Sequence, residues 1–129
     1  MLVAALLFGV FCFRAQRETD LRLLAQAGAQ EAYDRFSAFL EKGEESGYWG
    51  GVAAFYAYER AYSLLTSREE ASLDERILCS EVYGSLLLHP EESKAHLDEL
   101  IDVLALLSED VMAREGYAAM EALRNALER

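Results

Sequence analysis

The sequence predicts an all-α protein, a bundle of four or five helices with an apolar, membrane-anchor-like helix at its N-terminus. Three observations lead to this prediction. The 129 residues include only one proline, Pro90, and eight glycines, which leaves long runs of good helix formers. β-branched residues never alternate with polar ones over the length of a strand. Hydrophobic residues make up 53 % of the chain, enough for one compact core.

Charge is distributed unevenly along the chain. The formal net charge is −11, yet residues 1–22 carry three arginines against Glu18 and Asp20, a net of +1. The remaining residues therefore carry −12. A body this acidic repels phosphate groups, so we do not expect nucleic acid as a partner.

Residues 1–17 form the first predicted unit, an apolar leader with a polar collar. Met1–Phe13 (MLVAALLFGVFCF) has no polar side chain except the Cys12 thiol. As a helix it is roughly 20 Å long, shorter than the ~30 Å hydrocarbon core of a bilayer. A signal peptide lacks support because no charged n-region or cleavage site is present, and a buried helix normally keeps a polar face. We therefore expect a membrane anchor whose beginning lies upstream.

The second predicted unit, residues 18–129, is the helical bundle, and it begins with an amphipathic helix that ends near Lys42. Apolar residues recur along this helix at steps of three and four, which is typical of one buried stripe. These are Leu21, Leu24, Gly28, Ala32, Phe36 and Phe39. Gly43 follows the helix at the position where a C-terminal glycine is common.

The next helix, Gly47–Leu65 (GYWGGVAAFYAYERAYSLL), is predicted to be central to the bundle. It holds the only tryptophan and four of the seven tyrosines, and it is apolar on nearly every side. Such a helix has to be covered on nearly every side. Gly50 and Gly51 near its start indicate either fraying or a close approach by another helix. The predicted structural core comprises Trp49, Phe55, Tyr56, Tyr58 and Tyr62, with Phe36 and Leu104 from other helices.

Start signals divide the rest of the chain into further helices. Ser72 and Glu75 have the spacing of a capping box and precede a helix that reaches about Leu88. Pro90 suits the first turn of the next helix. A break is predicted near residues 107–111, which leaves open whether the last two helices are separate or one kinked helix.

Few residues suggest chemistry. Glu92, His96 and Glu99 would share one face of a single helix, as metal ligands could, but no second copy of the pattern follows and a solvated acidic face explains it more simply. Glu59, among aromatic residues, could be a functional carboxylate, although a partner on a neighbouring helix is the simpler reading. Cys12 and Cys79 are expected to be reduced, buried thiols. We predict no catalytic residue, no metal and no cofactor, and we do not expect an enzyme.

The order of these segments resembles a family of small, membrane-anchored, all-helical bacterial proteins of unknown function. The resemblance covers most of the chain and lies in the apolar leader, the Gly-Tyr-Trp at residues 47–49, and the run from HLDELIDVLALL to MEALRNAL. It implies a single-pass membrane anchor and an extracytoplasmic domain. The arginines that follow the leader favour the cytoplasm by the positive-inside rule, so the outward location rests on the resemblance.

A second resemblance is to one tetratricopeptide-like helical hairpin. Tyr33, Phe36 and Leu40, followed by Ala54 and Tyr58, look like the large and small positions of that repeat. The connecting turn is too long, and no second copy appears at the expected spacing of ~34 residues. We predict a membrane-tethered helical interaction or structural module. The alternatives are a tetratricopeptide-like adaptor and a metal-binding or enzymatic bundle, and a protein partner and a homo-oligomer both stay open.

Overall fold

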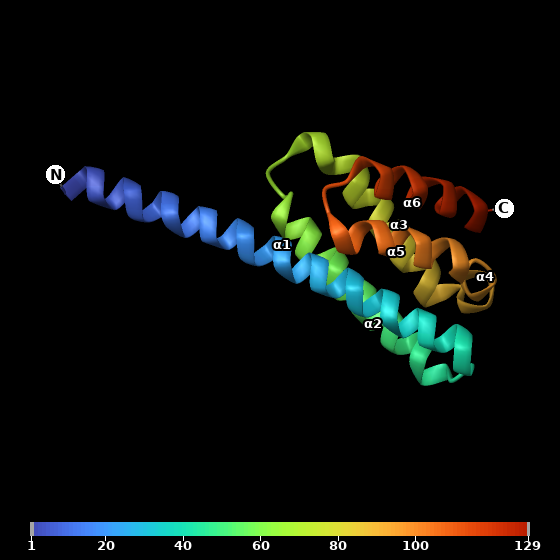
Figure 1. The fold of residues 1–129 in the computed structure, drawn as a ribbon. Helices are drawn as coiled ribbons and strands as arrows, with labels where there is room; N and C mark the ends of the chain where they lie inside the picture. Colours follow the sequence, from blue (N-terminus) through green and yellow to red (C-terminus); the bar gives the residue numbers. More distant parts are fainter. Residues whose placement is uncertain (1, 129) are drawn as a thin grey trace.

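The computed structural model describes residues 2–128, and every regular element within them is helical (Figure 1). The bounds are α1 (Leu2–Lys42), α2 (Glu45–Leu65), the 3₁₀ helix η1 (Glu70–Ser72), α3 (Leu73–Leu88), α4 (Pro90–Ala95), α5 (Leu97–Glu109) and α6 (Arg114–Leu127). The all-α prediction is confirmed. The number of α-helices in this part of the chain is six, slightly more than the four or five expected.

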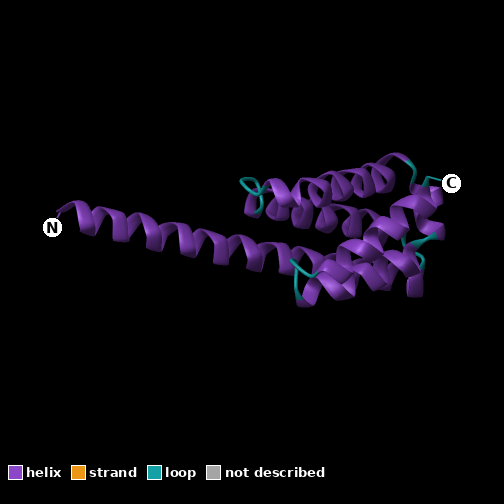
Figure 2. Cartoon of the chain, turned by 90° about the horizontal axis from the view of Figure 1, so that it is seen from above, coloured by secondary structure: helices purple, strands orange, loops and turns teal. Residues whose placement is uncertain are grey.

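α1 runs without a break across the boundary predicted between residues 17 and 18. Its first half projects from the bundle as an isolated rod, whereas its second half packs against α2 and α5 (Figures 1 and 2). Every residue from Leu2 to Asp20 is exposed, and Ala25 is the first buried one. The prediction that Cys12 is buried is therefore wrong, because the body does not reach this part of α1. We call Leu2–Asp20 the arm and residues 21–128 the body.

The predicted membrane anchor is wrong. Within residues 2–128, no helix has a stretch that is both long and apolar enough to cross a bilayer. α1 has ample length at 41 residues. However, five charged side chains lie between Arg14 and Arg22, so its apolar run ends after Phe13. This finding overturns the expected anchor and the membrane-anchored location that depended on it.

Glycines let α1 and α2 approach closely. A Cβ added at Gly28 would lie 2.8 Å from the backbone nitrogen of Tyr58, and one added at Gly51 would lie 2.6 Å from carbons of the Phe36 ring. Gly43, with φ of +70°, ends α1 and lets the chain reverse into α2. Of the two readings of the Gly50–Gly51 pair, the close helix approach is therefore the one observed at Gly51.

Two glycine-to-alanine substitutions test this close pairing. Gly28→Ala should destabilise the protein by about 1–3 kcal/mol, because overpacking outweighs the better helix propensity of alanine. Gly84, inside α3, has nothing within 4 Å of an added Cβ. Gly84→Ala should therefore stabilise the protein by up to about 1 kcal/mol. Urea unfolding followed by circular dichroism measures both changes, and stabilisation at both positions would contradict the close contact.

The body buries most of the predicted core but leaves two of its aromatic residues exposed. Phe36, Phe55, Tyr58, Tyr62 and Leu104 are each at most 2 % exposed.

Trp49 and Tyr56 were predicted to be core residues, and they are 42 % and 46 % exposed. The helices that cover α2 are mainly α1 and α3. Trp49, Ala53, Tyr56 and Arg60 share the stripe that stays exposed. The Trp49 ring rests edge-on against Tyr48, with centroids 5.0 Å apart, and Tyr56 lies beside Tyr83. The prediction failed because an apolar stripe on a helix can stay uncovered when no other helix packs against that side.

Helix boundaries after residue 70 follow the predicted breaks with two differences. The side chain of Ser72 makes no capping hydrogen bond and donates instead to Glu69 Oε2 at 3.1 Å, so the predicted capping box does not form. Pro90 begins α4, but the helix predicted from there is two helices that meet at His96. The break near residues 107–111 is confirmed, since α5 ends at Glu109 and α6 begins at Arg114.

Candidate functional site

A chain of polar groups crosses the core between α2, α3 and α6. Tyr117 donates its hydroxyl proton to the Val111 carbonyl, so its oxygen is free to accept from Tyr58, 2.7 Å away. The Tyr58 oxygen lies 3.5 Å from Cys79 Sγ, which in turn lies 3.8 Å from Met120 Sδ. Each proton in this chain has an acceptor. No motif in the sequence indicated the network, because its members come from distant segments.

The Cys79 thiol is poorly suited to nucleophilic chemistry. Burial raises its pKa to about 12, and the hydrogen-bond contact with the Tyr58 hydroxyl offsets only part of that shift. Burial likewise raises the pKa of Tyr58 and of Tyr117. A thiol this strongly protonated holds almost no thiolate, which is the reactive form. The network therefore serves to connect the three helices.

Glu59 is the buried carboxylate that the sequence singled out, and it links α2 to α3. Its side chain is almost fully buried, and Oε1 accepts hydrogen bonds from Ser63 and Ser80, both at 3.3 Å. A shallow depression of about 540 Å³ lies over it, lined also by Arg60 and Arg76. Both hydroxyls donate to the carboxylate. Ser63 lies on α2 itself, and Ser80 lies on α3, so Glu59 has a partner on a neighbouring helix.

The three residues weighed as metal ligands do not share one helix. Glu92 belongs to α4, His96 lies between α4 and α5, and Glu99 belongs to α5. His96 Nδ1 lies 3.2 Å from Glu99 Oε1 at the surface. Within residues 2–128, no three histidine, cysteine, aspartate or glutamate side chains converge as metal ligands would.

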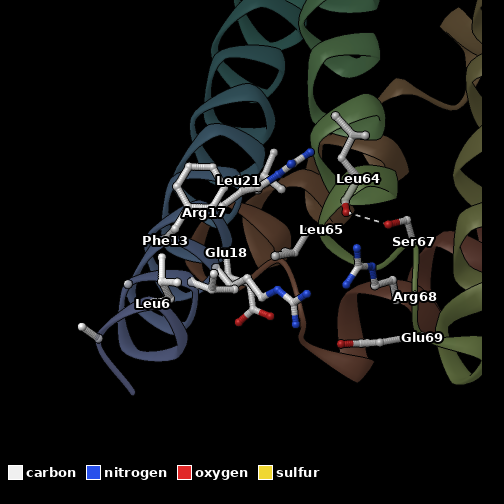
Figure 3. Close-up of a pocket in the computed structure, with 14 residues that line it drawn as sticks. Leu6, Phe13, Arg17, Glu18, Leu21, Leu64, Leu65, Ser67, Arg68 and Glu69 are labelled. Atoms are coloured by element: carbon white, nitrogen blue, oxygen red, sulfur yellow. Dashed lines mark hydrogen bonds between the residues drawn. The ribbon is translucent and has the colours of Figure 1, made fainter. Parts of the chain in front are cut away.

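A hollow lies where the arm leaves the body. It has a volume of about 580 Å³, and we call it the root groove. One side is the arm itself, and the other is the C-terminal end of α2 with the turn that follows (Figure 3). Its lining residues are Ala5, Leu6, Gly9, Val10, Phe13, Arg14, Arg17, Glu18, Leu21, Leu64, Leu65, Ser67, Arg68 and Glu69.

The turn that forms the far wall of the root groove is held by hydrogen bonds. Thr66 is fully buried, and its Oγ1 donates to the Tyr62 carbonyl at 2.9 Å. Arg76, from α3, donates Nη1 to the carbonyls of Thr66 and Glu69. Ser67 Oγ donates to the Leu64 carbonyl at 3.1 Å, the bond drawn in Figure 3. Hydrogen bonds within the body therefore fix this wall, and no bound partner is needed to form it.

The lining of the root groove is partly apolar and partly charged. Leu6 and Phe13 come from the apolar part of the arm, and the charged residues Arg17, Glu18, Arg68 and Glu69 lie where the arm meets the body (Figure 3). Across the whole arm, eight large apolar side chains from Leu2 to Phe13 are between 49 % and 82 % exposed. The sequence had marked this segment as apolar, but only the structure shows that the body leaves it uncovered and places a groove beside it.

Comparison with known proteins identifies no relative. No family model matches the sequence, and neither a curated protein nor a solved structure matches it.

Proposed function

We propose that this protein is a helical interaction module whose arm and root groove bind an apolar helix of a protein partner. The observation that supports this proposal is the set of eight exposed apolar side chains between Leu2 and Phe13, of which Leu6, Val10 and Phe13 line the root groove. Contiguous apolar patches larger than a few hundred Å² are rare on monomeric proteins and are typical of binding surfaces. The three phenylalanines alone expose roughly 300 Å² or more, since each side chain carries about 150–250 Å².

A helix is the partner element that suits this surface. The arm offers a straight helical wall, and helices bind one another by laying an apolar stripe into an apolar groove. Burial contributes about 25 cal/mol for each Å² of apolar surface removed from water. The charged lining residues Arg14, Arg17 and Arg68 would remain near solvent, as polar residues at the edge of an interface usually do.

The proposal can be tested by photo-cross-linking in the cell that makes the protein. A photoreactive phenylalanine analogue is placed at Phe13, which lines the root groove, or at Phe11, which does not. The two side chains are 68 % and 69 % exposed, so they are matched in type and accessibility. We expect one dominant protein adduct from position 13, identified by mass spectrometry, and a much weaker yield from position 11.

Two results would contradict the proposal. The first is the absence of any protein adduct at position 13. The second is an equal set of adducts at positions 13 and 11, since non-specific collisions with an apolar helix would not distinguish the groove face of the arm from the opposite face.

A further inference from the structure

We infer that the helix that occupies the root groove is the arm of a second copy of this chain, so that two arms pair antiparallel about a two-fold axis. This inference rests on the proposed function, because it names the partner of the same surface. It differs from that function in being testable with the purified protein alone.

The molecule carries both halves of such a contact. Leu2–Phe13 of the arm is an uncovered apolar helix, and the root groove beside it is lined in part by apolar side chains, Leu64 and Leu65 of the body among them. A two-fold axis makes every contact reciprocal, so each copy both inserts its arm and receives one. No additional protein is needed to cover the groove.

An axis near Gly9 and Val10 gives a consistent register. It sets Leu6 of one copy opposite Phe13 of the other, and it sets Leu2 opposite Arg17. Leu2 of the incoming arm then lies near the wall formed by residues 64–69, which also line the groove. Gly9 has nothing within 4 Å of an added Cβ, which leaves room for a second helix at the centre.

Charge favours the antiparallel arrangement over the parallel one. Residues 23–129 carry −12, while Leu2–Phe13 carries no charge. From Val10 to Leu24 the helix rises roughly 21 Å, so antiparallel arms hold the two acidic bodies roughly 40 Å apart. That distance is several times the Debye length of ~8 Å at physiological salt. Parallel arms would bring the bodies side by side, where they repel.

The size of the groove predicts a reversible dimer. Fourteen residues line it, fewer than the roughly 20 residues per partner of a standard stable interface. An isologous pair also leaves the opposite face of the arm, with Leu7 and Phe11, outside the contact. The dimer should therefore dissociate on dilution rather than behave as an obligate pair.

Sedimentation equilibrium of the full chain over a wide concentration range tests this inference. The unmodified protein should pass from monomer to dimer as its concentration rises. Leu6→Glu should raise the dissociation constant about 100-fold or more, because the two-fold axis applies the substitution twice. Leu7→Glu is the matched control, since Leu6 and Leu7 are 68 % and 67 % exposed but only Leu6 lines the groove. Leu7→Glu should leave the dissociation constant nearly unchanged.

The outcomes separate this inference from the proposed function. A chain that stays monomeric at every concentration overturns the second copy as partner, whereas a different protein cross-linked at position 13 would still support an interaction module. Larger oligomers that Leu7→Glu disrupts as strongly as Leu6→Glu also overturn the antiparallel pair. Failure of both the sedimentation and the cross-linking experiments removes both proposals.

Small-angle X-ray scattering of the dimer shows whether the two arms are parallel or antiparallel. Antiparallel arms predict an elongated particle with two separate bodies, which gives a second maximum in the distribution of interatomic distances. A compact dimer with a single maximum would mean that the bodies lie side by side, and it would overturn the antiparallel arrangement.

Discussion

Phe36→Ala should lower the free energy of unfolding by about 3–5 kcal/mol, the range for truncating a buried aromatic side chain. The Phe36 ring is fully buried where α1 crosses α2, with the Tyr48 ring 5.8 Å away and Gly51 directly against it. The surrounding backbones are already in close contact, so they have little freedom to collapse into the cavity. Urea unfolding followed by circular dichroism measures the loss.

Phe11→Ala supplies the control on the same helix. Phe11 lies on the exposed arm, so its truncation removes no packing from the body and should change the free energy of unfolding by less than about 0.5 kcal/mol. Both variants are compared at a dilution where the chain is monomeric. A comparable loss from both substitutions would mean that the arm belongs to the folded core.

Raising the pH from about 9 to about 12 should unfold the body. Burial raises the pKa of Cys79 from 9.0 to about 12 and that of Tyr62 from 10.0 to about 12. Folding keeps both groups protonated, so their stabilising contribution is intact below pH 9 and is lost as the pH rises toward the folded-state values. One proton changes stability by 1.36 kcal/mol per pH unit, so Cys79 alone accounts for about 4 kcal/mol over this range.

Cys79→Ala tests this source of alkaline sensitivity. The free energy of unfolding is measured by urea titration at several pH values between 9 and 12. The variant should lose stability with a slope shallower by about one proton, that is, by about 1.4 kcal/mol per pH unit. An identical slope in the variant would show that the thiol does not titrate differently in the folded and unfolded chains.

Local signals in the sequence predicted the helical class and several helix boundaries. Gly43 ends α1 and Pro90 begins α4 because backbone conformation at those positions depends mainly on the residue itself. Phe36 and Tyr58 could be assigned to the core because each lies on an apolar stripe. The capping box at Ser72 failed, since Glu69 offered its side chain a competing partner.

Which apolar stripes become covered was decided only by the tertiary structure. Trp49 and Tyr56 are large aromatic residues like Phe55, but they lie on the side of α2 that stays exposed. The Tyr58–Cys79–Tyr117 chain and the root groove join residues far apart in sequence, so no periodicity within one segment could predict them. The sequence by itself determined that Leu2–Phe13, the first part of the arm, is an uncharged apolar segment. The body determined that the arm stands uncovered beside a groove, because the other helices pack against α1 only beyond Asp20.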